Sequence, residues 1–110
     1  MSAAPAEEVV LCLSTAPDTE TAERIARTLV EERLIACANL LAGAVSVYRW
    51  EGAVHRDDEV VLLMKTRSSL VGGLKDRLAV LHPYEVPELL VVGVRDGLAA
   101  YCGWVLDETA

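Results

Sequence analysis

Residues 45–58 read VSVYRWEGAVHRDD, and this stretch decides the fold because it has the pattern of a β-hairpin. Glu51-Gly52 predicts a two-residue turn, since glycine tolerates the positive φ that tight hairpin turns need. Successive side chains of a strand point to opposite faces. The turn therefore places Tyr48 directly across from His55, on the face opposite Arg49.

The two arms of this hairpin, residues 35–50 and 53–67, are too long for a small domain to cover. At about 3.3 Å per residue each arm reaches roughly 45–50 Å, more than twice a typical strand. The distal part, residues 46–58, either extends into solvent or pairs with another subunit. We expect pairing between subunits, because a solvated ribbon has no need of Tyr48 and Trp50.

Apolar periodicity predicts the elements before and after the hairpin. An aliphatic run over residues 8–15 is typical of a buried strand, and residues 19–33 show helical spacing behind Asp18, a good N-cap. Gly43 interrupts the first arm and predicts a bulge. The elements after the hairpin are a helix over residues 70–81 capped by Ser68 or Ser69, a buried strand over 88–95, and a last helix that begins at Asp96-Gly97 with Leu98, Tyr101, Cys102, Val105 and Leu106 on one face.

The order of these elements predicts an α+β fold of the ferredoxin-like βαββαβ type. It has an antiparallel sheet, a long hairpin between the second and third strands, and an extra C-terminal helix. Residues 1–7 are expected to be a disordered tail, and residues 8–110 a single domain. Because both main helices cover one face, the other face needs a partner. The 53% hydrophobic composition and mean hydropathy of +0.32 also favour an oligomer.

Charge and cysteine content narrow the classes of partner. The formal net charge of −7 argues against nucleic acids and anionic membranes. Neither a signal peptide nor a membrane-spanning run is visible. Three widely spaced cysteines without a CxxC pair are typical of reduced thiols, so we expect a cytoplasmic protein.

Residues 81–88, LHPYEVPE, gather polar side chains on a stiff segment. Each proline fixes its own φ and pushes the preceding residue out of helical geometry. A helix must therefore end here and an extended segment must follow. The octet is either a rigid corner or a functional loop, and in the second case its polar cluster is His82, Tyr84, Glu85 and Glu88, near a subunit boundary. Lys65 is expected to join this cluster in the cleft.

Neither catalysis nor a dedicated metal centre has a sequence signature. The sequence contains no nucleophile elbow, phosphate-binding loop or zinc-protease motif. The acidic run Asp57-Asp58-Glu59 is interpreted as a solvated ribbon edge. Residues of the types that bind metals are present, but they do not have the close spacing of a dedicated site. These residues are Cys12, Cys37, Cys102, His55, His82, Glu85 and Glu88. Trp50, Tyr84 and Trp104 could line a cleft between subunits, although packing at an interface explains them equally simply.

Three segments occur in a familiar order: STAPD at residues 14–18, ACANLLAGAVSVYRWEG at 36–52, and KTR at 65–67 followed by LHPYEVPELL at 81–90. Together they resemble the CutA family of divalent-cation tolerance proteins, over nearly the whole chain. The resemblance implies a homotrimer in which the hairpins pair between neighbours, a role in tolerance of copper and other divalent metals, and no catalytic activity. It also implies a shape like that of the PII signalling proteins.

The resemblance also implies copper ligands, which this chain retains only in part. A Cys expected before Thr-Ala-Pro is Ser14 here, and of two consecutive His expected before Pro-Tyr only His82 is present. Cys12, on the same strand face as Ser14, and Cys37 are the remaining thiol candidates. The residues expected to form the trimer interface are Tyr48, Arg49, Trp50, Glu51 and Gly52.

We therefore expect a trimeric, non-enzymatic protein that responds to metal ions, with altered Cu²⁺ binding and no required cofactor. One alternative is a PII-like sensor that holds a small anionic metabolite in the cleft between subunits, contacted by Arg49, Lys65 or Arg67. Another is a purely structural trimer without a ligand.

Overall fold

The computed structural model describes residues 7–110. The expected tail lies outside the described residues except for Glu7, whose carboxylate accepts hydrogen bonds from the Ser68 hydroxyl and the Ser69 N–H. In chain order the elements are β1 (Val9–Ala16), α1 (Thr19–Glu31), β2 (Cys37–Trp50), β3 (Ala53–Arg67), the 3₁₀ turn η1 (Ser68–Leu70), α2 (Val71–Leu81), β4 (Leu90–Gly93) and α3 (Ala99–Glu108).

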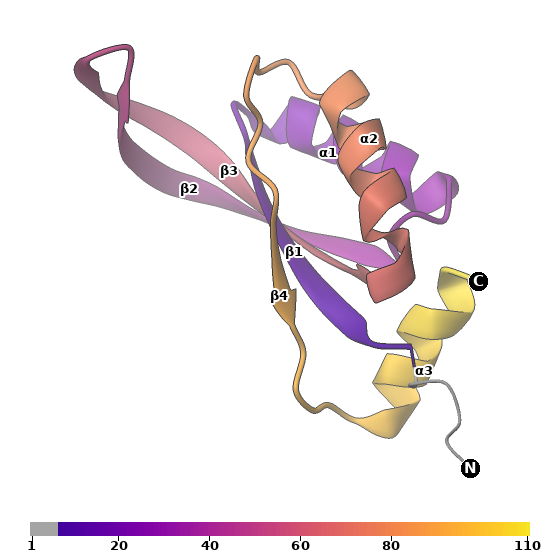
Figure 1. Ribbon diagram of the computed structural model, residues 1–110. Helices are drawn as coiled ribbons and strands as arrows, with labels where there is room; N and C mark the ends of the chain where they lie inside the picture. Colours follow the sequence, from indigo (N-terminus) through magenta and orange to yellow (C-terminus); the bar gives the residue numbers. More distant parts are fainter. Residues whose placement is uncertain (1–6) are drawn as a thin grey trace.

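The four strands form one antiparallel sheet in the order β2-β3-β1-β4 (Figure 1). This order, with β1 and β3 central, is that of the ferredoxin-like plait, so the predicted fold class is confirmed. Helices α1 and α2 lie on one face of the sheet, and α3 packs at the end away from the hairpin tip. The molecule measures 55 × 26 × 25 Å because the hairpin projects beyond the helices.

The core lies between the sheet and helices α1 and α2. Alternate residues of β1 and of the inner half of β3 point into it, as the two-residue period of a strand requires. The Asp18 carboxylate accepts a hydrogen bond from the Thr21 N–H at 2.7 Å, so the predicted N-cap is confirmed. Helix α1 ends at Glu31 rather than Arg33, because Arg33 adopts a left-handed φ of 59°.

The hairpin has the predicted register. Glu51 and Gly52 have φ of 49° and 80°, as a type I′ turn requires, and Tyr48 lies opposite His55. The register shifts between Leu41 and Ala44, where Gly43 has a φ of 87°. Gly43 therefore forms the predicted bulge.

Three local predictions are wrong. Neither Ser68 nor Ser69 caps α2 with its side chain, because the 3₁₀ turn η1 precedes that helix and Glu7 satisfies the serines instead. Strand β4 is only four residues long, and all of them are exposed in the single chain, where β4 is an outer strand that pairs only with β1. On α3 only Val105 of the predicted apolar face is buried, and Leu98 is 81% exposed.

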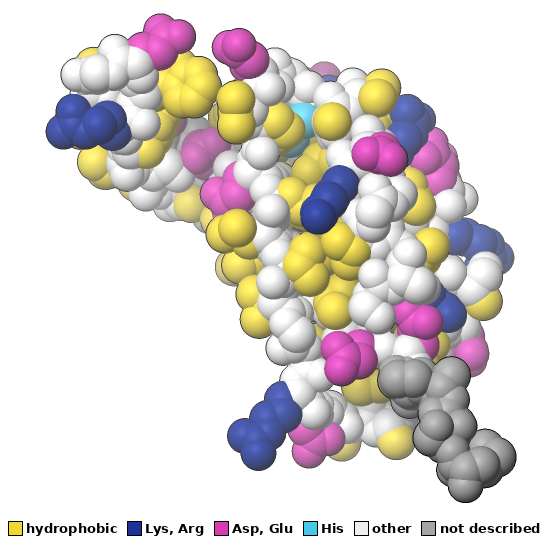
Figure 2. Space-filling view, viewed as in Figure 1, with side chains coloured by type: hydrophobic (Ala, Val, Ile, Leu, Met, Phe, Trp, Pro, Cys, Tyr) yellow, Lys and Arg dark blue, Asp and Glu magenta, His cyan; other side chains and the backbone are white. Residues whose placement is uncertain are grey.

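Exposed apolar side chains follow the two outer strands of the sheet. Strands β2 and β4 each pair on one side only, within the described residues. Figure 2 shows hydrophobic side chains at the surface beside β4. The exposed large apolar residues on these strands and on the distal hairpin are Leu41, Val45, Val47, Tyr48, Trp50, Val54, Leu90, Val91 and Val92. No described helix is both long and apolar enough to cross a membrane.

Candidate functional site

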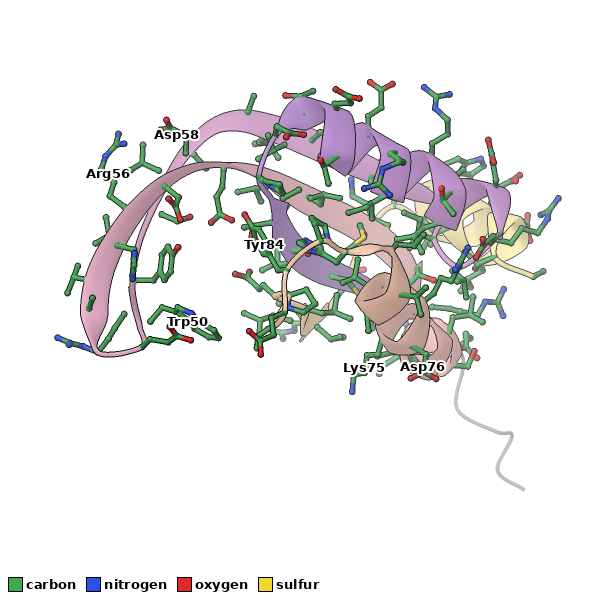
Figure 3. The ribbon with its side chains drawn as sticks, turned by 90° about the horizontal axis from the view of Figure 1, so that it is seen from above. Trp50, Arg56, Asp58, Lys75, Asp76 and Tyr84 are labelled. Atoms are coloured by element: carbon green, nitrogen blue, oxygen red, sulfur yellow. The ribbon has the colours of Figure 1, made fainter. Side chains whose placement is uncertain are left out.

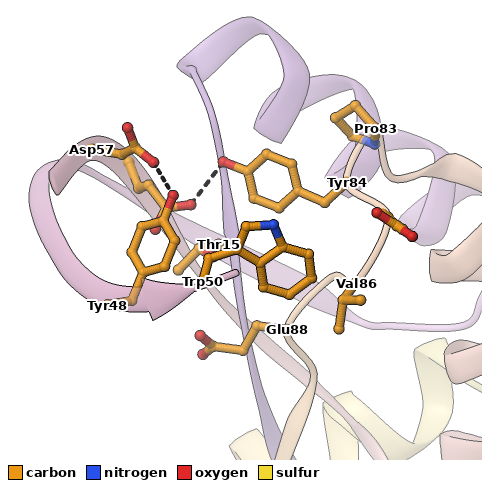
Figure 4. A pocket seen from close by; sticks show the side chains of 10 residues that line it. Thr15, Tyr48, Trp50, Asp57, Pro83, Tyr84, Val86 and Glu88 are labelled. Carbon is orange, nitrogen blue, oxygen red and sulfur yellow. Dashed lines mark hydrogen bonds between the residues drawn. The ribbon is translucent and has the colours of Figure 1, made fainter. Parts of the chain in front are cut away.

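A pocket of about 470 Å³ lies between the distal hairpin and the loop that follows α2. Figure 3 shows that the hairpin curves, so that Trp50 projects back toward the body of the subunit and Tyr84. Figure 4 shows the rings of Tyr48, Trp50 and Tyr84 around the same space as Glu88. The lining residues are Thr15, Tyr48, Trp50, Asp57, Glu59, Pro83, Tyr84, Glu85, Val86 and Glu88.

His82 fixes the loop that forms one wall of this pocket. Its Nδ1 accepts a hydrogen bond from the Tyr84 N–H at 3.1 Å. Its Nε2 lies 2.7 Å from the Thr15 carbonyl oxygen, which can only accept, so Nε2 carries the proton and donates. His82 is buried, and its ring packs against that of Tyr84 with centroids 4.7 Å apart. Both ring nitrogens are thus occupied, and the imidazole connects the loop to the end of β1.

Two tyrosines of the pocket are oriented by carboxylates of β3. The Tyr84 hydroxyl donates to Glu59 at 2.8 Å, and the Tyr48 hydroxyl donates to Asp57. Burial, together with the hydrogen bond to Glu59, raises the pKa of Tyr84. The hydrogen bond to Asp57 raises the pKa of Tyr48, because ionisation would place a phenolate beside a carboxylate. Both phenols therefore remain neutral donors at physiological pH.

The charge of the pocket lining is entirely negative. Asp57, Glu59, Glu85 and Glu88 contribute four carboxylates, and the lining includes no Lys or Arg among the described residues. Trp50, 41% exposed, supplies the largest apolar surface. The lining therefore combines aromatic faces with acidic groups, which is suited to a cation.

The structure does not bring the predicted metal ligands together. Cys12 and Ser14 lie under the helices, whereas Cys37 pairs with Lys65, which projects from the opposite face of β3. His82 is held at the end of β1 by its two hydrogen bonds. Among residues 7–110, no three His, Cys, Asp or Glu side chains converge where they could hold a metal ion.

Each thiol or hydroxyl among these candidates has its own environment. Burial raises the pKa of the Cys12 thiol, which disfavours the thiolate that binds metals. Cys37 Sγ lies 3.6 Å from the Tyr101 hydroxyl of α3. The Ser14 hydroxyl is fully buried and has no hydrogen-bond partner among the described residues.

The predicted polar cluster is brought together only in part. Tyr84, Glu85 and Glu88 line the pocket, and His82 supports it from behind. Lys65 does not belong to this cluster, because its ammonium donates to Asn39 on the inner half of the hairpin.

The residues expected at the trimer interface divide between the two faces of the hairpin. Tyr48 and Trp50 line the pocket, whereas Arg49 pairs with Val54 and shares the other face. Glu51 and Gly52 form the turn at the tip.

Sequence reasoning missed Thr15, Asp57 and Glu59 as lining residues. The prediction that the acidic run is a solvated edge follows from the fact that neighbouring strand residues face opposite ways. Residues two apart share a face, however, so Asp57 and Glu59 both lie on the side of Tyr48. Diagonal pairing across the hairpin, Tyr48 with Asp57, is the signal that could have found them.

Comparison with known proteins shows to which family the chain belongs. The model of the family described as CutA1 divalent ion tolerance protein matches residues 10–108. The chain belongs to the CutA family. It is 46% identical over 103 residues to the divalent-cation tolerance protein CutA of Thermus thermophilus, covering 94% of this chain and 98% of that protein. The corresponding protein of Pyrococcus horikoshii is 43% identical over 101 residues, covering 92% and 98%.

Solved structures of the family share the fold over almost their whole length. The crystal structure of CutA from Xylella fastidiosa superimposes with a TM-score of 0.91 at 46% identity, covering 94% of this chain and 99% of that one. The CutA1 structure from Oryza sativa has a TM-score of 0.91 at 35% identity, with 94% of both chains covered. The family and its fold are therefore common to distant organisms.

Proposed function

We propose that this protein acts in the response to divalent metal ions as a cytoplasmic homotrimer, without catalysing a reaction. Its relatives are named for divalent-cation tolerance. Cys12, Cys37 and Cys102 are free, which suits a reducing compartment. The observation that carries the assembly is the pair of unpaired sheet edges on β2 and β4, both bearing exposed apolar side chains.

Two different free edges on one subunit favour head-to-tail assembly. When the β2 edge of one copy meets the β4 edge of the next, the contact is heterologous, and repetition about an axis closes a ring. The number of subunits, three, comes from the resemblance to the family. In such a ring the hairpin residues Tyr48 to Gly52 lie beside a neighbour, and Val91 and Val92 become covered.

Sedimentation of the protein over a range of concentrations tests this assembly. Val47→Lys on the hairpin and Val92→Lys on β4 are expected to weaken trimer formation, because each places a charge on an outer strand. Val80→Lys is the matched control, since Val80 is 74% exposed on α2, away from both edges. A wild-type protein that stays a folded monomer at micromolar concentration contradicts the proposal, as does equal weakening by the control.

We also propose that one subunit binds Cu²⁺ only weakly. Both nitrogens of His82 already make hydrogen bonds, so ligation requires one of these bonds to break. Ser14 offers a hydroxyl where the family resemblance implies a thiolate, which is a far better ligand for copper.

Titration with Cu²⁺ against a competing chelator measures this affinity. We expect binding in the micromolar range or weaker, about −8 kcal/mol or less favourable, with no difference between wild type and His55→Ala. A tight, stoichiometric site that disappears in His82→Ala contradicts the proposal. Circular dichroism of His82→Ala at the titration temperature separates lost ligation from lost folding.

The sensor alternative receives partial support from the pocket. A cavity of this volume suits a small molecule. Its four carboxylates repel an anionic metabolite, however, and the cations expected to contact one lie elsewhere. Lys65 binds Asn39, and Arg67 donates to Thr109 at 3.0 Å and to the Leu106 carbonyl.

A further inference from the structure

The pocket between the hairpin and the loop after α2 combines three aromatic rings with four carboxylates. We propose that it binds a small organic cation, an alkylammonium ion. This ligand goes beyond the proposed response to metal ions and requires no copper, and His82 contributes only by supporting the loop. The argument rests on charge, on the shape of the lining, and on the absence of a convergent metal centre among residues 7–110.

The charge selects a cation. Asp57 and Glu59 each accept a hydrogen bond from a tyrosine, which fixes their positions but leaves their negative charge. Glu85 and Glu88 line the opposite wall and make no ion pair within the described residues. A ligand carrying positive charge is therefore attracted from both sides of the cavity.

The lining selects an organic cation over a bare metal ion. A divalent metal needs several oxygen ligands at about 2.0–2.6 Å, and no three carboxylates of the described chain converge in this way. A cavity of about 470 Å³ is also large for a single ion, but it lies in the range for small ligands. Trp, the best ring for a cation, faces the cavity beside Tyr48 and Tyr84 (Figure 4).

Hydrogen bonds hold the two tyrosine rings of the pocket in place before any ligand arrives. His82 joins the loop to β1, Tyr84 joins the loop to β3 through Glu59, and Tyr48 joins the two hairpin arms through Asp57. Pro83 limits the freedom of the loop backbone. A site whose aromatic walls are already oriented loses little conformational freedom on binding.

Calorimetry with choline tests the proposal on the intact protein. We expect choline to bind at least tenfold more tightly than 3,3-dimethylbutan-1-ol, which has the same shape without the charge. In parallel, 1,4-diaminobutane distinguishes a primary ammonium, which carboxylates bind by hydrogen bonds, from a quaternary ammonium, which aromatic faces bind. Binding of either cation supports the proposal. Failure of both up to about 10 mM, or equal affinity for the neutral alcohol, overturns it.

A matched pair of charge-removing variants locates the binding. Glu88→Gln is expected to weaken binding of the cation roughly three- to tenfold. Asp58→Asn removes the same charge from the other face of the hairpin, where Asp58 lies 3.6 Å from Arg56, and is expected to change affinity less than twofold. Equal effects of the two variants mean that only the net charge matters, which overturns the assignment to this pocket.

Fluorescence supplies a second readout that does not depend on these variants. The chain has two tryptophans, so Trp104→Phe on α3 leaves Trp50 as the only reporter. We expect choline to shift or quench this emission with the affinity measured by calorimetry. Emission that does not respond, or a response that Mg²⁺ at the same concentration reproduces and displaces, overturns the proposal. Because the proposed assembly brings a neighbour beside Tyr48 and Trp50, sedimentation gives the oligomeric state of each sample, and binding by the assembled or by the dissociated protein supports the proposal.

Discussion

The two halves of β3 have the same alternation of side chains but opposite surroundings. In the inner half, every second residue from Val60 to Thr66 is buried under the helices, whereas every residue from Ala53 to Asp58 is exposed. Helix α1 has 13 residues and spans about 20 Å, whereas the 15 residues of β3 span about 50 Å. The comparison teaches that alternation specifies a strand, while the length of the covering helices specifies how much of it a subunit can bury.

The largest expected effect is on the inner half. Leu62→Ala should lower the free energy of unfolding by about 2–5 kcal/mol, because Leu62 is 1% exposed and its removal leaves a cavity. Val54→Ala on the distal half, 64% exposed, should change it by less than about 0.5 kcal/mol per subunit. Urea unfolding at one protein concentration measures both variants. Equal losses would mean that the distal half is covered, either within its own subunit or by a neighbour in the proposed assembly.

The two histidines allow the same comparison between a buried and an exposed position with a single residue type. His82→Ala should cost about 2–3 kcal/mol, because it leaves the Thr15 carbonyl and the Tyr84 N–H without their partner. His55 lies on the distal hairpin, stacked on Tyr48 with centroids 5.5 Å apart, and His55→Ala should cost less than about 1 kcal/mol. Thermal unfolding compares the two. A greater loss at His55 would contradict this account of the loop.

In the core under the helices, Ser14 of β1 tests whether every buried polar group stabilises the fold. Ser14→Ala should raise the stability by about 1 kcal/mol, since the hydroxyl is buried without a partner. Thr66→Val is the control, because Thr66 is equally buried but donates to the Leu34 carbonyl at 2.8 Å. It should lower the stability by about 1–2 kcal/mol. A loss of stability in Ser14→Ala would show that its hydroxyl does have a partner.

The smallest effect on stability is expected at the surface of the two helices that cover the inner half of β3. There Arg77 of α2 donates two hydrogen bonds of 2.8 Å to Glu32 at the end of α1. These bonds lower the pKa of Glu32 below its ordinary value of 4.5. A carboxyl whose pKa is lower in the folded state stabilises that state above the unfolded pKa and loses this contribution as the pH falls through the folded pKa.

Melting temperatures of wild type and Glu32→Gln measured from pH 7 down to pH 3 test this contribution. Wild type should be slightly more stable at pH 7, and the difference should shrink below about pH 4.5. Added salt should reduce it as well. A difference that grows toward acid would give the opposite sign and contradict the linkage between α1 and α2.

The features that sequence predicted correctly depend on neighbours along the chain. The turn at Glu51-Gly52, the pairing of Tyr48 with His55 and the Asp18 cap each follow from a few consecutive residues. The pocket could be predicted only in part, through Trp50, Tyr84 and the polar loop, because it also joins residues from β1 and from β3 that lie far away along the chain. The prediction that Ser68 or Ser69 caps α2 is wrong for the same reason, since these serines bind Glu7, which lies about sixty positions earlier in the chain.

The unpaired edges of β2 and β4 also affect how a single subunit behaves before any assembly. A newly synthesised subunit carries two open rows of backbone donors and acceptors, flanked by valine and leucine side chains. These rows will accept any extended segment with matching hydrogen bonds, including misfolded neighbours. Assembly into the proposed trimer would cover these rows and so protect a new subunit from aggregation, whereas low cellular abundance would delay that assembly.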